Sequence, residues 1–261
     1  GASGAEAGAP AGAGASESER VIRETADEVN GMLVDRILRA EAMDWGETVK
    51  REDGVEVWAA HLGEEVWGDW PAGVGPALGG GRIEATMARA VVDASPEDIF
   101  KMFGRNDLVP EYNEFCRELE DIMVLDGSTK VTWGATGRMG PFGPRDFVTR
   151  CHTTELEGGV HVAGNLAESL PELAEACRAK GKSGSYCRME VLIGGTIARP
   201  IDGGARSEYT ILCLTNPGGS ADTPIGSAIM NKVAATGPLS HVAQIRKMVA
   251  KERWNKPLPG E

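Results

Sequence analysis

The residue types that most often perform chemistry are thinly spread along this sequence. None of the four histidines stands at the spacing from a second ligand that a zinc site requires. The five cysteines are an odd number and include no Cys-x-x-Cys pair. They lie mostly in apolar, strand-like segments, so we predict reduced packing residues, with a disulfide or a metal role as the alternative. These residues are His61, His152, His161 and His241, and Cys116, Cys151, Cys177, Cys187 and Cys213.

Two further kinds of catalytic or cofactor site find no support in the sequence. The glycines Gly134, Gly137, Gly140 and Gly143 lack the Lys-Ser/Thr pair of a phosphate-binding loop and do not precede a predicted helix. No Gly-x-Ser-x-Gly segment offers a nucleophilic serine. We therefore expect no metal, no cofactor and no acyl-transfer chemistry.

Charge narrows the range of partners. The chain of 261 residues has 39 acidic and 27 basic side chains, a formal net charge of -12, which disfavours nucleic acid. Between Thr223 and Lys256, however, six basic residues stand against one acid, Glu252. These cations could meet an anionic surface or complement a helix C-terminus. The longest apolar runs are far shorter than the roughly 20 residues of a membrane-spanning helix.

The elements that must position any site follow one order along the chain. Residues 1–16, rich in Gly and Ala, predict a disordered tether. Because the sequence opens on Gly1 and not on Met, a preceding targeting segment stays an open alternative. An amphipathic helix is expected over 17–47, a short helix capped by Ser95 over 96–103, and a kinked terminal helix over 224–254. Strands are expected over 55–60, 83–92, 116–125, 130–135, 147–154, 159–163, 186–198 and 206–214.

This order predicts one α+β domain over 17–256, with a tail at 257–261, in which a curved antiparallel sheet is gripped by the terminal helix. Alternation gives each strand one apolar face; Val131 and Trp133, for example, oppose Lys130 and Thr132. Such a face suits an apolar ligand pocket with a few polar groups. Periodicity alone favours a solid core, so a cavity must be argued from other features.

Residues 140–148, Gly-Pro-Phe-Gly-Pro-Arg-Asp-Phe-Val, resemble the loop-and-strand signature of START (steroidogenic acute regulatory protein-related lipid transfer) domains. Residues 195–219 resemble the late strands of that family, and 224–231 the start of its terminal helix. The resemblance covers roughly 17–252. It implies a helix-grip fold around a tunnel for one lipid, closed by the terminal helix and the loop 139–144. It also implies that Arg145 and Asp146 fix this loop and are not catalytic.

The sequence departs from the sterol-transferring members of that family. Those members have a buried acid on the strand before the loop and a base further along the next strand, whereas 130–134 here contains no carboxylate. Arg150 stands one position short of the family's base, so alternation turns Cys151 inward and Arg150 outward. A sterol ligand is therefore disfavoured relative to a generic lipid.

The function that the resemblance implies is non-catalytic binding and intermembrane transfer of a single lipid. The alternatives are a helix-grip enzyme of the polyketide cyclase or aromatase type, or a ligand-gated interaction module. We expect a monomer in the cytoplasm that contacts membranes transiently and binds a phospholipid, a sterol or another apolar molecule. Residues expected at the membrane or lid are Phe142, Lys232 and Arg246. Residues expected to contact the ligand are Val131, Trp133, Phe147, Thr149, Cys151, Met189, Val191, Tyr209, Ile211, Ile229, Val233 and Val242.

Overall fold

The computed structural model describes residues 17–71, 75–77, 82–169 and 186–255. The predicted tether, the predicted tail and Cys177 lie outside these residues, and the domain limits stay a prediction. The helices are α1 (Glu17–Glu24), α2 (Ala26–Ala42), α3 (Glu64–Trp67), α4 (Pro96–Phe103), α5 (Val109–Tyr112), α7 (Pro224–Ala234) and α8 (Gly237–Val249). The strands are β1 (Lys50–Glu52), β2 (Val55–Ala60), β3 (Ala85–Val92), β4 (Cys116–Val124), β5 (Thr129–Thr136), β6 (Arg145–Leu156), β7 (Val160–Ala167), β8 (Cys187–Arg188), β9 (Glu190–Ile201) and β10 (Arg206–Asn216).

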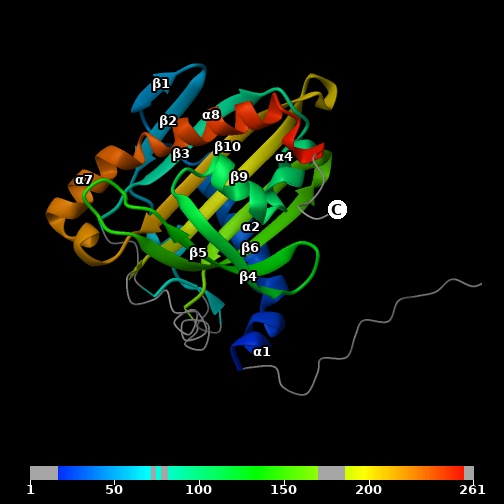
Figure 1. The fold of residues 1–261 in the computed structure, drawn as a ribbon. Helices are drawn as coiled ribbons and strands as arrows, with labels where there is room; N and C mark the ends of the chain where they lie inside the picture. The colour runs from blue at the N-terminus through cyan, green and yellow to red at the C-terminus, as the bar shows by residue number, and fades with distance from the viewer. Residues whose placement is uncertain (1–16, 72–74, 78–81, 170–185, 256–261) are drawn as a thin grey trace, which may run out of the picture.

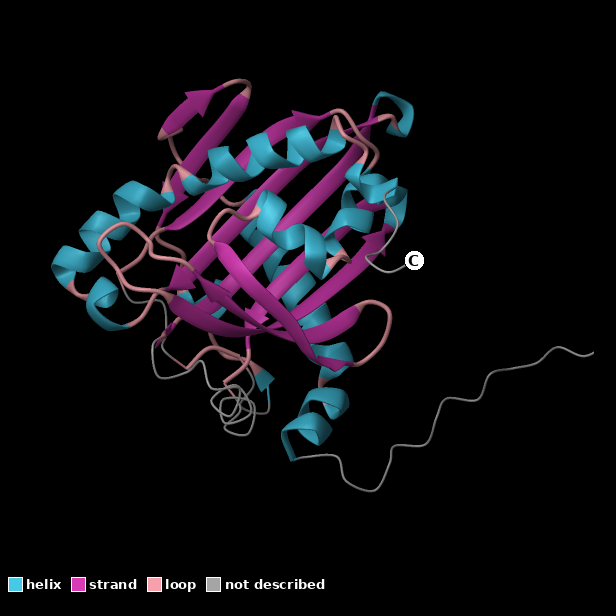
Figure 2. Cartoon of the chain, in the orientation of Figure 1, coloured by secondary structure: helices cyan, strands magenta, loops and turns pink. Residues whose placement is uncertain are grey.

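The strands form one strongly curved sheet in the order β1-β2-β3-β10-β9-β7-β6-β5-β4. All neighbours along this order are antiparallel, and β8 adds a short parallel pairing to β6. Helix α8 crosses one face of the sheet and α2 lies behind the other (Figures 1 and 2). The predicted α+β class, with a curved sheet and a terminal helix across it, is confirmed.

Helix α2 lies close to the sheet because two strands offer glycine beneath it. A Cβ atom at Gly164 would stand 2.7 Å from Leu33, and one at Gly195 would stand 2.6 Å from Ile37. Both distances are shorter than a normal carbon contact, so only glycine permits this approach. We call the side of the sheet toward α1 and α2 the α2 face, and the opposite side the α8 face.

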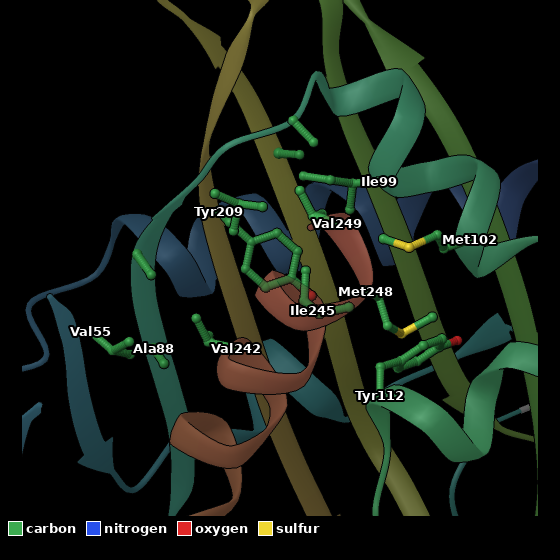
Figure 3. Close-up of a cluster of buried hydrophobic side chains, with 14 of the residues drawn as sticks. Val55, Ala88, Ile99, Met102, Tyr112, Tyr209, Val242, Ile245, Met248 and Val249 are labelled. Atoms are coloured by element: carbon green, nitrogen blue, oxygen red, sulfur yellow. The ribbon is translucent and has the colours of Figure 1, made fainter. Parts of the chain in front are cut away.

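On the α8 face, one end of the strands is packed as a solid core. Side chains of α4 and α8 meet those of β3, β9 and β10 there, with Tyr209 at the centre (Figure 3). Ala88, Ala90 and Ala198 give the helices room to approach the sheet. This packed cluster ends near Ile211, which is only partly buried.

Two predicted elements are interrupted, each for a local reason. The helix expected over 17–47 bends at Thr25, whose hydroxyl donates to the Val21 carbonyl at 2.8 Å, and it ends at Ala42. The strand expected over 186–198 breaks at Met189, because Arg188 binds Asp146 on β6 and holds β8 against that strand. The predicted kink of the terminal helix is confirmed, since α7 and α8 are separate helices.

Candidate functional site

Six strands contribute one residue each to a row that crosses the α8 face. Register brings these residues side by side, and directly opposed residues of paired strands point to the same side of a sheet. We call this set the central row. From β3 to β5 its members are Thr86, Cys213, Gly194, Asn165, Cys151 and Lys130.

The middle strands carry little side-chain volume around this row. Ala163 and Ala167 on β7 and Gly194 and Thr196 on β9 all belong to the α8 face. Cys151, Asn165 and Cys213 keep accessible surface although they lie inside the sheet's concave side. Beyond the packed cluster at Tyr209, the side chains of this face are therefore small and weakly polar, and several keep accessible surface.

Asn165 stands at the middle of the row, between Cys151 and Gly194. Among the described residues its side-chain amide makes no hydrogen bond, and the side chain is half-buried. A Cβ atom on Gly194 would lie 3.4 Å from the Asn165 Cβ and 3.7 Å from its Nδ2. Gly194 thus places no side chain of its own against the amide, and the Cγ1 of Val191 lies beside the same position.

The titratable groups in this region carry no free charge at neutral pH. Burial raises the pKa of the Cys151 and Cys213 thiols, although hydrogen bonds with neighbouring threonines oppose the shift, so both stay protonated. Lys130, at the end of the row, donates to Asn106 at 2.7 Å and to Asp121 at 3.2 Å. Its charge is therefore already engaged.

A histidine on the terminal helix fixes that helix to the sheet. The Tyr209 hydroxyl and the His241 Nε2 are 2.7 Å apart, and the two rings stack. Burial lowers the pKa of His241 to about 4, although a hydrogen bond with the Tyr112 backbone opposes the shift, so the ring is neutral. The Nε2 of a neutral His241 can accept a hydrogen bond from the Tyr209 hydroxyl, so this pair clamps α8 to β10.

Solved structures that resemble this chain are START-related lipid-transfer domains. Human StAR-related lipid transfer protein 5 gives a TM-score of 0.71 at 14% sequence identity, over 88% of this chain and 99% of that chain. Human STARD10 gives 0.63 at 16% identity, over 84% of this chain and 78% of that chain. The STAR-related lipid transfer protein of Xanthomonas axonopodis gives 0.60 at 15% identity, over 79% and 99%. The chain has the START fold.

The START fold, also called helix-grip, confirms the fold that residues 140–148 and 195–219 implied. No protein-family model and no curated protein matches the sequence itself. The likeness therefore lies in the course of the backbone.

Within this START fold, Arg145 and Asp146 make structural contacts, and their expected role at the 139–144 loop stays a prediction. The Arg145 guanidinium donates to the Pro217 carbonyl at 3.1 Å, and so ties the start of β6 to the turn after β10. Asp146 accepts two hydrogen bonds from Arg188, at 2.9 and 2.8 Å. Both side chains are buried and both act on structure.

Val131 and Trp133 were expected on the inward face with Tyr209, and this is wrong. They lie on the α2 face, packed with Ile22 of α1, and the Trp133 indole donates to Asp146 at 3.2 Å. The alternation itself was correct. Because the START fold covers both faces of this sheet, the apolar side of β5 does not have to be the α8 face.

Tyr209 and Val242 do lie between the sheet and α8, but neither has accessible surface. They belong to the packed cluster and not to the part of the face around the central row. Among the other residues expected at a ligand, Phe147, Thr149, Cys151 and Ile211 share the α8 face by register. Val191 lies beside Gly194, with its Cγ1 3.2 Å from the Cβ position.

Two other predicted ligand contacts lie elsewhere, and a third is not described. Ile229 on α7 is 37% exposed, so it faces outward and not into the fold. Met189 is half-buried at the break between β8 and β9. The side chain of Val233 lies outside the described part of the structure.

Two of the three residues expected at the membrane or lid are engaged inside the protein. Phe142 is buried, with the Arg145 guanidinium 5.5 Å from its ring centre. Arg246 donates to the backbone carbonyls of Val91 and Asp53 at 2.7 to 3.1 Å. The Arg246 contacts hold α8 to β3 and to the turn of the β1–β2 hairpin. A role of Phe142 and Arg246 at a membrane or lid stays a prediction. Lys232 is exposed.

Arg150 leaves the α8 face, as alternation predicted, but it does not reach solvent. Its Nε donates to Glu168 at 2.5 Å, and both side chains are fully buried on the α2 face. The expectation that Arg150 faces outward is corrected to a buried ion pair, whose acid the sequence analysis did not identify.

Two surface hollows lie away from the central row. One, of about 320 Å³, lies between α2 and α3 and is lined by Arg36, Arg39 and His61 among others. The other, of about 390 Å³, lies along the β1–β2 hairpin, beside Glu208. Neither is lined by a residue of the central row.

Asn165 is the residue that the sequence analysis missed. The strand was expected to end at Ala163, because Gly164 and Asn165 are turn-forming residue types. The structure continues β7 to Ala167. Alternation from Val162 onward could have placed Asn165 on the face opposite Leu166.

Proposed function

We propose that this protein binds one lipid between the α8 face of its sheet and the covering helices, and transfers it between membranes without catalysis. One observation carries the proposal: the small, weakly polar side chains around the central row keep accessible surface inside the sheet's concave side. Side chains that line an internal ligand site have this character. The START fold, which includes lipid-transfer proteins, supports the same function.

The hydrophobic effect would supply the binding energy. Removing one methylene from water contributes about 0.8 kcal/mol, so a chain of about 16 carbons contributes roughly 12 kcal/mol before the costs of binding. No ion pair is needed for affinity of this kind. A face of Ala, Gly, Thr, Cys and Ile residues is sufficient.

Helix α7 is the part of the surface that we propose to meet a membrane. Ile225 is 78% exposed and Ile229 37% exposed, and Lys232 lies one turn further along the same helix. Apolar side chains beside a cation suit the interface of an anionic bilayer. Among the described residues, no helix is both long and apolar enough to cross one. Cytoplasmic location and the monomeric state stay predictions.

A cyclase-type enzyme on the same scaffold would need a titratable group that touches the substrate. Tyr209 has no accessible surface, and its hydroxyl is bound to His241. Both groups therefore serve the attachment of α8 in this arrangement. We accordingly favour binding over catalysis.

The test compares two substitutions of the same kind. Gly194→Leu would fill the space beside Asn165, whereas Gly127→Leu adds the same side chain where nothing lies within 4 Å. Native mass spectrometry after incubation with labelled vesicles should show one lipid on the wild type and on Gly127→Leu, and none on Gly194→Leu. A wild type that takes up no lipid would overturn the proposal.

A further inference from the structure

The central row contains one side-chain amide, that of Asn165, which makes no hydrogen bond with the described residues. The Asn165 carboxamide has two donor hydrogens and an acceptor oxygen, and none of these is used by the described residues. The side chain is half-buried and keeps accessible surface, so its amide is open to a partner from outside the chain. A polar group placed in this way inside a sheet is a candidate for binding the polar group of a ligand.

The groups around Asn165 indicate whether a neutral or a charged ligand group would bind there. Its neighbours in the row are the protonated thiol of Cys151 and the hydrogen of Gly194. Beside Cys151, the hydroxyls of Thr132 and Thr149 are 3.1 Å apart and bind each other. The amide therefore stands among neutral groups.

The nearby cations are all engaged elsewhere. Lys130 is paired with Asp121, and the Arg145 guanidinium is bound to backbone carbonyls. Arg150, which precedes Cys151 on β6, points to the α2 face and is paired with Glu168. Within the described residues, an anionic head group at Asn165 would therefore meet no cation that could compensate for its desolvation.

We propose that Asn165 hydrogen-bonds the single uncharged polar group of the bound lipid, such as a hydroxyl or an ester carbonyl, and that this chain selects neutral lipids over charged ones. The inference rests on the proposed function, since it takes a lipid on the α8 face as given. A neutral amide fits such a group because it can both donate and accept.

The first experiment measures selectivity in the full chain. Phosphatidylcholine vesicles would contain matched pairs of probes: hexadecanol with palmitate, and dioleoylglycerol with dioleoylphosphatidate, at pH 9. Native mass spectrometry of the re-purified protein should find the neutral member of at least one pair bound ten times or more in excess of its charged partner and of phosphatidylcholine. Equal or preferential uptake of charged lipid would overturn this inference and leave the proposed function standing. No uptake of any lipid would overturn both.

The second experiment tests the residue. Asn165→Leu keeps the side-chain volume and removes the amide, so uptake of hexadecanol should fall about tenfold relative to uptake of hexadecane. Thr154→Val, on the opposite α2 face of the neighbouring strand β6, is the matched control and should change neither.

A structural role is distinguished by stability. Loss of an unpaired amide should leave the midpoint of urea unfolding of the lipid-free protein unchanged or higher. If Asn165→Leu lowered that midpoint, or reduced uptake of hexadecanol and hexadecane equally, Asn165 would be a packing residue and the inference would be wrong.

Discussion

The Tyr209–His241 contact shows how one hydrogen bond can fix a terminal helix. Tyr209 comes from β10 and His241 from α8, and their contact of 2.7 Å joins α8 to Tyr209 of the packed cluster. Because the ring is desolvated, its protonation would bury a charge and would remove the hydrogen bond that Nε2 accepts from the Tyr209 hydroxyl.

This contact predicts a pH dependence of stability. The pKa of His241 is about 4 in the folded protein and near its ordinary value of 6.5 when unfolded. The unfolded chain therefore binds the proton more readily, so stability falls as pH drops from about 6.5 to 4, by about 3 kcal/mol in total. Urea unfolding at several pH values should show this loss in the wild type and a smaller one in His241→Gln. Equal slopes in the two proteins would contradict the assignment.

At the residue scale too, the buried Arg150–Glu168 ion pair carries a desolvation cost that lowers the stability of the fold. Arg150 Nη1 and Nη2 and Glu168 Oε2 are buried without a hydrogen-bond partner among the described residues. Desolvation raises the pKa of Glu168, although Arg150 opposes the shift. Two charges taken out of water are compensated here mainly by each other.

Removing one partner should therefore be worse than removing both. Glu168→Leu leaves the Arg150 charge buried alone and should lower the free energy of unfolding by about 3 to 5 kcal/mol. The double change Arg150→Met with Glu168→Leu should cost less than Glu168→Leu alone. A double-mutant cycle from urea unfolding measures the coupling, and a double variant that lost the sum of the two single effects would exclude it.

At the scale of the elements, two adjacent glycines of β9 serve opposite faces. Gly195 lies under Ile37 of α2, whereas Gly194 belongs to the central row on the opposite face. Strand alternation alone separates a packing position from a position in the proposed ligand site one residue away.

Substitution by alanine should separate these roles. Gly195→Ala overpacks the contact with Ile37 and should lower the free energy of unfolding by about 1 to 3 kcal/mol. In the matched variant Gly194→Ala the nearest atom to the added Cβ is the Cγ1 of Val191, at 3.2 Å, so the variant should cost less. Chemical denaturation checks both, and Ile37→Val should relieve part of the Gly195→Ala effect. A larger loss for Gly194→Ala would contradict the assignment of faces.

Helix α7 leaves two apolar side chains, Ile225 and Ile229, exposed at the surface. Replacing Ile225 and Ile229 by Asp should lower binding to anionic vesicles about tenfold, because two apolar side chains would no longer enter the interface. Val124→Asp, at an exposed position of β4, is the control. Vesicle co-sedimentation measures the effect, and thermal unfolding should be little changed, since both isoleucines are exposed. Unchanged co-sedimentation would exclude α7 as the docking surface.

At the scale of the whole molecule, the sheet is covered on both sides, so lipid binding should stabilise the fold as a unit. A lipid at 100 times its dissociation constant would add about 2.7 kcal/mol to the free energy of unfolding. Thermal unfolding with hexadecanol should show this rise in the wild type and not in Gly194→Leu. A rise of equal size in both would place the lipid outside the central row.

The sequence by itself determined the order of the elements, the helix start at Ser95 and the break before Gly237, because caps, glycine and proline act over a few residues. The segment 140–148 also indicated the START fold. It could not determine which side of β5 faces α8, since alternation separates two faces without telling which is inside when both are covered.

Only the tertiary structure decided where the polar groups meet. Asn165 gains its setting from Cys151 on one neighbouring strand and Gly194 on the other, and Arg150 finds Glu168 on β7's continuation. These partners are fixed by strand register and helix packing across long stretches of chain. The local conformational preferences of the residues do not contain that information, so only the folded sheet shows which residues form the candidate site.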